Sequence, residues 1–264
     1  MRSLLASVLL VAACGGDNNN PKLDGHAPTD SRPVDARRDG TALVDGSGGG
    51  SAVSHTIAID GTNDFTSGET FSTTSSPTFS AYVTWDADNL YIGYAGPDLA
   101  TTTADASTKW LFAYVDVDPG AATGATVSQL YNTQQITMPA GFGAEHYFRF
   151  KSDGTFRSQE NYNGSGWASD ATTPTSANAG MYTEAAIPRA LFPGNTAGLV
   201  MYMINEKGGA ESTFAGLYTD DFVDGYSDHT APKALLHYLR IDFTSHLDPD
   251  SGANEEPAPI DADI

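Results

Sequence analysis

The chain contains little cysteine, few basic residues and no long apolar stretch. Cys14 is the single cysteine among 264 residues, which excludes an internal disulfide framework and a zinc site built from several cysteines. Asp and Glu number 33 against 13 Lys and Arg, so the formal net charge is −20 and nucleic acid is a poor partner. The apolar run at residues 4–11 is too short to span a bilayer.

Motifs of the common enzyme classes are also lacking. The sequence has no Gly-X-Ser-X-Gly elbow, no His-Glu-X-X-His pair and no Gly-rich phosphate loop, and its six histidines are scattered. We therefore expect a non-catalytic protein. An acid pair for glycoside hydrolysis stays open, because the 21 acidic residues of 55–245 make close pairs common by chance.

The first fourteen residues have the features of an export signal. Arg2 supplies a positive start, the apolar run follows, and the small residues Ala12 and Ala13 precede Cys14. This arrangement resembles a bacterial lipobox, which implies cleavage before Cys14 and acylation of that cysteine. The alternative is an ordinary secretory signal that contains a cysteine. Because Gly15 and not Asp follows Cys14, we expect an anchor in the outer membrane.

Composition divides the chain into four parts. Residues 1–13 are the expected signal peptide, and residues 14–54 combine the lipidated cysteine with a disordered linker rich in Gly, Asp and Pro. Residues 55–245 carry the apolar side chains of a folded domain. Residues 246–264 hold six acidic residues without Lys or Arg, which is typical of a disordered acidic tail.

The domain has strand patterns throughout and no helical period over three turns. Residues 79–85 alternate in polarity, and the turn formers 86–89 join them to a second alternating run, which predicts a β-hairpin. The predicted fold is therefore all-β, a two-sheet antiparallel β-sandwich of jelly-roll-like form. The expected strands lie at residues 79–85, 90–94, 110–118, 145–151, 155–159, 181–187, 199–205 and 235–243.

Six short motifs follow one another through the domain, at residues 59–62, 81–92, 112–118, 147–155, 183–188 and 239–243. Their order resembles the carbohydrate-binding modules of family 9, within the wider DOMON-like group of β-sandwiches. The resemblance covers residues 55–245, with longer insertions near 120–143 and 206–232. It implies sugar binding at an aromatic platform and, often, a structural calcium ion. Some DOMON-like relatives bind haem through His or Met instead.

The strand at 110–118 carries an aromatic stripe. Trp110, Phe112 and Tyr114 alternate with smaller apolar residues and therefore point to the face opposite the core. Rings on an open sheet face can stack on pyranose rings, which predicts a sugar platform. The alternative is that the two insertions cover this face and make it a second core layer.

Three further aromatic residues lie in loops and are predicted ligand contacts. Trp167 follows a Gly-rich turn, and Tyr218 and Phe222 belong to the second insertion. Aromatic side chains on loops of a rigid scaffold commonly bind ligands. They also commonly pin a loop to the domain, so both roles stay open.

Asp116 and Asp118 are the predicted calcium ligands, with Glu184 as a partner. Calcium takes six to eight oxygen ligands, and side chains two apart on a strand can supply two of them. The same Asp-X-Asp sequence before Pro119-Gly120 is also an ordinary strand exit. A second acidic group, at residues 220–228, lacks the spacing of an EF-hand.

Taken together, these features predict a non-catalytic, lipid-anchored, extracytoplasmic protein whose β-sandwich binds a polysaccharide or cell-wall glycan. The alternative from another class is a structural or adhesive surface lipoprotein without a small ligand.

Overall fold

The structure is a computed structural model that describes residues 55–100, 106–121, 123–172 and 174–244. The predicted signal peptide, the lipidated Cys14, the linker and the acidic tail lie outside the described residues. Among the described residues, no helix has the length and apolar character needed to cross a membrane. The described chain belongs to one compact unit.

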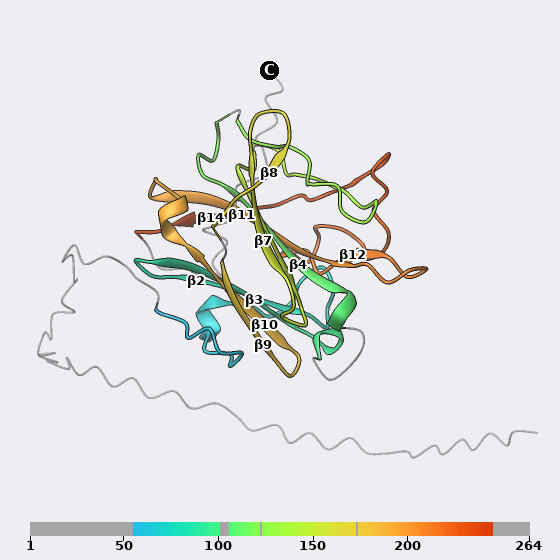
Figure 1. The fold of residues 1–264 in the computed structure, drawn as a ribbon, viewed down its shortest axis with the longest axis horizontal. Coiled ribbons are helices and arrows are strands. Elements are labelled where there is room, and N and C mark those ends of the chain that lie inside the picture. The colour runs from blue at the N-terminus through green and yellow to red at the C-terminus, as the bar shows by residue number, and fades with distance from the viewer. Residues whose placement is uncertain (1–54, 101–105, 122, 173, 245–264) are drawn as a thin grey trace, which may run out of the picture. The chain divides into compact units, whose positions relative to one another are not determined.

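One layer of the domain is an antiparallel sheet of five strands within the described residues (Figure 1). The hairpin predicted at residues 79–94 forms its centre, and the turn residues 86–88 give the tight connection expected from Asp-Ala-Asp. The strand order is β1 (Thr70–Phe71), β2 (Ser80–Trp85), β3 (Asn89–Ala95), β10 (Tyr182–Pro188) and β9 (Thr175–Ala179).

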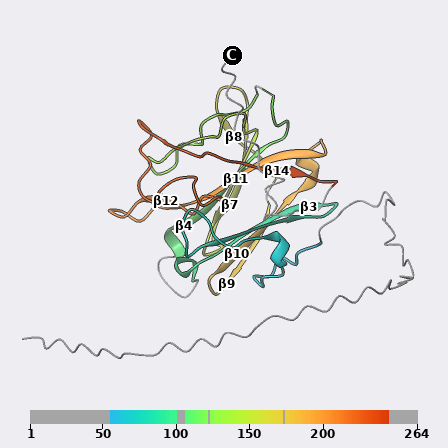
Figure 2. The same ribbon diagram turned by 180° about the vertical axis from the view of Figure 1, so that it is seen from behind.

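The second layer is a larger antiparallel sheet that crosses over the first (Figure 2). Its long central strands β4 and β11 pair over eight residues and form the rigid middle of the sheet. The path runs β12 (Ser212–Phe214), β11 (Thr196–Asn205), β4 (Lys109–Asp116), β6 (His146–Lys151), β7 (Arg157–Tyr162) and β8 (Trp167–Ser169), and β14 (Leu239–Asp242) pairs with β11.

The main core lies between the two sheets. Leu111, Ala113 and Val115 of β4 point into it, as the alternation of the sequence predicts, and meet Val83 and Ile92 of the other sheet. All five side chains are 0–1% exposed. Burial of apolar surface on this scale, at about 25 cal/mol per Å², is the main stabilising term for the sandwich.

A second core covers the outer face of the larger sheet. Loop residues 123–144 and 222–238 lie over β4 and β11, and a short parallel pair, β5 (Ile136–Thr137) with β13 (Lys233–Ala234), joins the two loops. Ile136, Phe142 and Tyr238 pack on the aromatic rows of the sheet. This face is therefore closed over β4 and β11.

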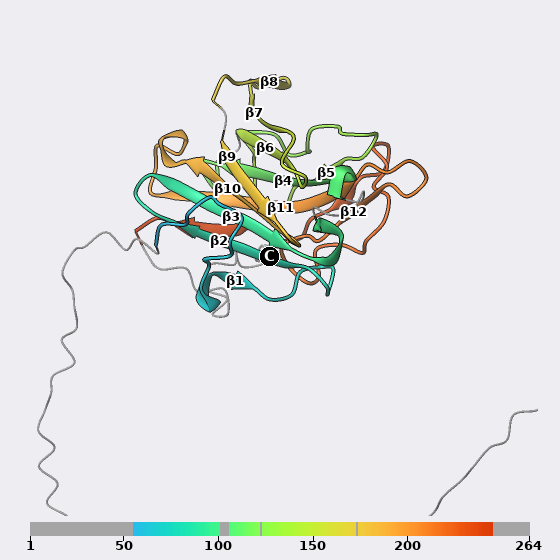
Figure 3. The ribbon, with the colours of Figure 1, turned by 60° about the horizontal axis from the view of Figure 1, so that its bottom comes forward.

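The strands β7 and β8 remain outside this cover. Figure 3 shows them standing away from the two layers, joined to the larger sheet through β6. Gly164 at the tip has φ +86°, a backbone conformation that favours glycine. This β7–β8 hairpin bounds the site described below.

The N-terminal part of the domain covers the outer face of the smaller sheet. Ile57 packs on Tyr91 and Ala186. The carboxylate of Glu184 accepts hydrogen bonds from the backbone N–H groups of Asp60 at 2.8 Å and Gly61 at 2.7 Å. This segment is thus fixed by satisfied polar groups beneath it.

The predicted all-β, two-sheet antiparallel sandwich is confirmed. The described residues contain no α-helix, only 3-10 turns, one of which, Arg189–Leu191, follows Pro188. The expected strand at 235–243 is shorter than predicted, because residues 235–238 lie in the covering loop and only Leu239–Asp242 pair with β11.

Candidate functional site

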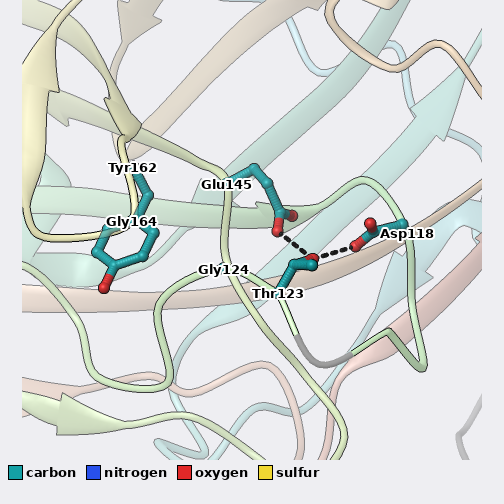
Figure 4. A pocket seen from close by; sticks show the side chains of 6 residues that line it. All are labelled: Asp118, Thr123, Gly124, Glu145, Tyr162 and Gly164. Carbon is teal, nitrogen blue, oxygen red and sulfur yellow. Dashed lines mark hydrogen bonds between the residues drawn. The ribbon is translucent and has the colours of Figure 1, made fainter.

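An open pocket of about 560 Å³ lies at the end of β4, beside the β7–β8 hairpin. Tyr162 of the hairpin lies on one side, and Asp118, Thr123 and Glu145 lie on the other (Figure 4). Gly124 and Gly164 complete the lining. The pocket thus combines an aromatic ring with carboxylate and hydroxyl oxygens.

Strand pairing brings the acidic side chains together. The register of β4 with β6 pairs Val115 with His146, so Asp116 and Glu145 face each other at the strand ends. Asp116, Asp118 and Glu145 each have a carboxylate oxygen within 4.8 Å of the others. We call these three residues the pocket carboxylates; Asp118 and Glu145 line the pocket, and Asp116 is fully buried next to them.

A hydroxyl and two N–H groups hold the pocket carboxylates in place. The Thr123 hydroxyl lies 2.8 Å from Asp118 Oδ1 and 3.0 Å from Glu145 Oε1 and bridges them. Gly143 N–H donates to Asp116 Oδ2 at 2.9 Å, and Val117 N–H donates to Glu145 Oε2 at 3.0 Å. The group is therefore preorganised by the backbone.

Gly124 permits the close approach of the loop to Glu145. Its φ is +75°, and a Cβ at this position would lie 2.6 Å from Glu145 Oε1. A larger residue would also clash with the backbone of Gly143, whose C and O atoms lie 2.3 Å from that Cβ position.

Ionising all three pocket carboxylates together is unfavourable, because they lie close to one another and are partly or fully buried. Burial raises the pKa of the Asp116 carboxyl to about 6; the N–H groups of Gly143 and Asp118 oppose this shift, while the charges of Glu145 and Asp118 add to it. Burial also raises the pKa of Glu145, and the charge of Asp118 adds to that shift. A bound cation would relieve this repulsion.

The predicted calcium set is partly corrected. Asp116 and Asp118 do lie together, but Glu184 lies in the other sheet, where its carboxylate accepts two backbone N–H groups and the Tyr182 hydroxyl at 2.9 Å. Glu145, and not Glu184, has a carboxylate oxygen within 4.8 Å of those of Asp116 and Asp118. Only the register of β4 with β6, which the sequence does not reveal, puts Glu145 opposite Asp116.

The predicted platform of Trp110, Phe112 and Tyr114 is also corrected. Their exposed fractions are 6%, 0% and 0%, because the loops cover this face. Phe112 and Tyr114 stack on Tyr147 and Tyr202 with ring centroids 4.8–6.0 Å apart. The alternative interpretation, a second core layer, is the one found.

The loop aromatics have different surroundings. Trp167 is half-buried and packs against Tyr162 with ring centroids 5.5 Å apart, so it supports the wall of the pocket. Tyr218 is buried, 8% exposed, in the main core. Phe222 is half-buried and lines a separate hollow of about 350 Å³ beside Val223. The sequence did not predict Tyr162 as a ligand contact, because nothing in its local sequence distinguishes it from an ordinary strand residue.

Two solved structures are similar to this chain, and both are carbohydrate-binding modules of family 9 from Caldicellulosiruptor kristjanssonii, the group that the ordered motifs resemble. The complex with cellotriose has 15% sequence identity and a TM-score of 0.33, and the match covers 63% of this chain and 82% of that chain. The complex with glucose has 15% identity and a TM-score of 0.28, with 78% and 90% covered. No family model and no curated protein matches the chain.

Proposed function

We propose that the protein is a non-catalytic saccharide-binding protein and that the pocket beside the β7–β8 hairpin holds the sugar. The observation that carries the proposal is the pairing of the Tyr162 ring with carboxylate and hydroxyl oxygens across one open pocket. The volume of about 560 Å³ falls within the range of small-ligand sites.

The two sides of the pocket suit the two sides of a sugar. Sugar hydroxyls donate to carboxylates, and the free lone pairs of Asp118 and Glu145 accept them at fixed positions. The C–H face of a pyranose ring packs on an aromatic ring such as Tyr162. Because no Lys or Arg lines the pocket, it favours a neutral sugar over an anionic one.

The pocket carboxylates also fit a calcium ion. Calcium prefers hard oxygen ligands, and three carboxylates within 4.8 Å supply at least three of the six to eight that it needs. When bound, the ion would offset the mutual repulsion of Asp116, Asp118 and Glu145 and fix the pocket wall. The sugar would then meet a neutralised wall.

The arrangement of the acids supports binding over hydrolysis. Glycoside hydrolases place two carboxyl groups on either side of the bond that they cleave. Here Asp118 and Glu145 share the Thr123 hydroxyl between them, so the gap that a glycosidic bond would need is filled.

The membrane anchor is part of the same proposal and rests on the sequence. A lipid on Cys14 would hold the domain outside the cytoplasm, in the outer membrane, at the end of the linker 14–54. Several acyl chains, at about 0.8 kcal/mol per buried methylene, anchor stably. A structural or adhesive lipoprotein without a ligand is the competing function.

The test is a glycan-array screen of the purified full-length protein, with calcium and with chelator, followed by titration of the best neutral glycan. Tyr162→Ala and Asp118→Asn should each weaken that binding at least tenfold. Tyr226→Ala is the matched control, because Tyr226 is 46% exposed on a covering loop and lines no part of the pocket. Binding of no glycan by a folded protein would favour the structural alternative.

A further inference from the structure

Arg149 lies in a cage of aromatic rings on the outer face of β6. Its guanidinium carbon is 5.3 Å from the ring centre of Trp110, 5.0 Å from that of Tyr131 and 5.1 Å from that of Phe156. Tyr147, at 6.0 Å, closes the inner side. We call Arg149 and these four rings the Arg149 cage.

The guanidinium has no anionic partner within the described residues. Glu206 accepts the hydroxyl of Tyr131, and Glu160 is paired with Tyr147 across β6 and β7, yet neither forms an ion pair with Arg149. Several other cationic side chains of the domain have a polar partner of their own. Lys109 lies 3.8 Å from Asp98, and Arg189 donates to the carbonyls of Phe192 and Gly194.

Other donors gather around the cage without acceptors. The buried Nε of Arg149, Nε1 of Trp110 and Oγ of Ser158 have no hydrogen-bond partner, and Ser158 is paired with Arg149 across the strands. Buried donors are normally satisfied, and each unpaired one costs about 1–3 kcal/mol. The described residues thus leave the polar groups around the cage unsatisfied.

The cage lies on the same sheet face as the pocket. Glu145, Tyr147 and Arg149 alternate along the strand, so all three point to one side. At about 3.3 Å per residue, Arg149 lies roughly 13 Å from Glu145. An oligosaccharide of a few units is therefore long enough to contact both the pocket and the cage.

We propose that the Arg149 cage binds the carboxylate of a uronic acid unit, carried by an oligosaccharide whose neutral part occupies the pocket. This rests on the proposed saccharide binding. A guanidinium pairs with a carboxylate through two parallel hydrogen bonds, and the exposed side of Phe156, which is 43% exposed, offers a surface for the sugar ring.

The competing explanation is that the rings alone satisfy the cation. A cation–π contact contributes about 0.5–2 kcal/mol and needs no ligand. In that case the carboxylate of a sugar would add nothing to binding.

The test uses aldotetraouronic acid, in which a glucuronate is attached to xylotriose, together with its methyl ester and unsubstituted xylotriose. Binding to the full-length protein is measured by calorimetry. The free acid should bind at least tenfold more tightly than the ester, and the difference should shrink as NaCl rises from 50 to 500 mM. Arg149→Gln should abolish the difference, Arg149→Lys should keep part of it, and Arg157→Gln, on the opposite sheet face, should leave it unchanged.

Equal affinity for the acid and its ester in the unmodified protein would overturn the inference without recourse to any variant. An Arg149→Gln variant that melts normally and keeps the tenfold preference would overturn it too. Neutral glycan binding that depends on Tyr162, with no gain from the carboxylate, would remove this inference and leave the proposed function standing. If neither charged nor neutral saccharides bind, both fail.

Discussion

The outer face of the larger sheet has a closed half and an open end, and strand β4 runs through both. In the closed half, Phe112 and Tyr114 lie under the loops and form stacked aromatic rows with Tyr147 and Tyr202. At the open end, Asp118 and Glu145 line a pocket whose far wall is Tyr162. Strand β4 thus supplies the core, and the residues that follow β4 and precede β6 supply the pocket, so the difference lies in what covers each part.

The same contrast separates the carboxylates of the two sheets. Glu69 and Glu184 are buried at 1% exposure, and hydrogen-bond donors surround each of them. Asp118 and Glu145 share the Thr123 hydroxyl and line an open pocket. Carboxylates satisfied by the fold stabilise it, whereas carboxylates that line an open pocket remain available to a ligand.

The largest expected effect is on the closed half. Phe112→Ala removes a fully buried ring that stacks on two others, so we expect a loss of about 3–5 kcal/mol in unfolding free energy. Urea unfolding measures it. Saccharide binding by the fraction that stays folded should be unchanged. A loss below about 1 kcal/mol would mean that the loops do not cover this face.

Glu184→Ala should have the next largest effect. It leaves the N–H groups of Asp60 and Gly61 and the hydroxyl of Tyr182 without their acceptor, which should cost about 2–3 kcal/mol. The shift in melting temperature between calcium and chelator should persist in this variant. Its disappearance would restore Glu184 to the calcium site.

Glu69 should make the stability of the domain pH-dependent. Burial opposes ionisation, but hydrogen bonds from Thr84 and Thr66 and the nearby His55 outweigh it and lower the pKa of Glu69. A lowered folded-state pKa means that the stabilisation is present above the unfolded value of 4.5 and is lost as pH falls through the folded value. Glu69→Gln should therefore cost about 1 kcal/mol at pH 7 and flatten the decline below pH 4.5. Parallel pH profiles for both proteins would contradict this.

Glu145→Gln should have the smallest effect on stability. The amide can still accept from Val117 N–H and donate to Thr123, so in chelator the unfolding free energy should change by less than about 1 kcal/mol. The increase in melting temperature with calcium should vanish, because a ligand that binds only the folded state stabilises it. A calcium shift equal to that of the unmodified protein would exclude Glu145 as a ligand.

Local patterns in the sequence are sufficient to predict most of the strands and the residues of the main core. The alternation at 79–94 predicts the hairpin, and Leu111, Ala113 and Val115 point inward as expected. Alternation cannot reveal what lies above the outward face, so it leaves both an open platform and a second core layer possible for Trp110 and Phe112.

Predicting the site requires information that the sequence of a single strand does not contain. Glu145 reaches Asp116 through the register of β4 and β6, and Tyr162 reaches the pocket through the course of the β7–β8 hairpin. Strand β9, Thr175–Ala179, was missed because its sequence is polar and half-exposed at a sheet edge. Pairing between distant segments, and not propensity, decides these features.

Calorimetric titration of a neutral glycan into the unmodified protein, Tyr162→Ala and Tyr226→Ala tests the central claim most directly. The account predicts that the unmodified protein and Tyr226→Ala bind alike and that Tyr162→Ala, although folded, binds at least tenfold more weakly, a loss of about 1.4 kcal/mol or more. Equal binding by all three proteins would show that the sugar does not lie in this pocket.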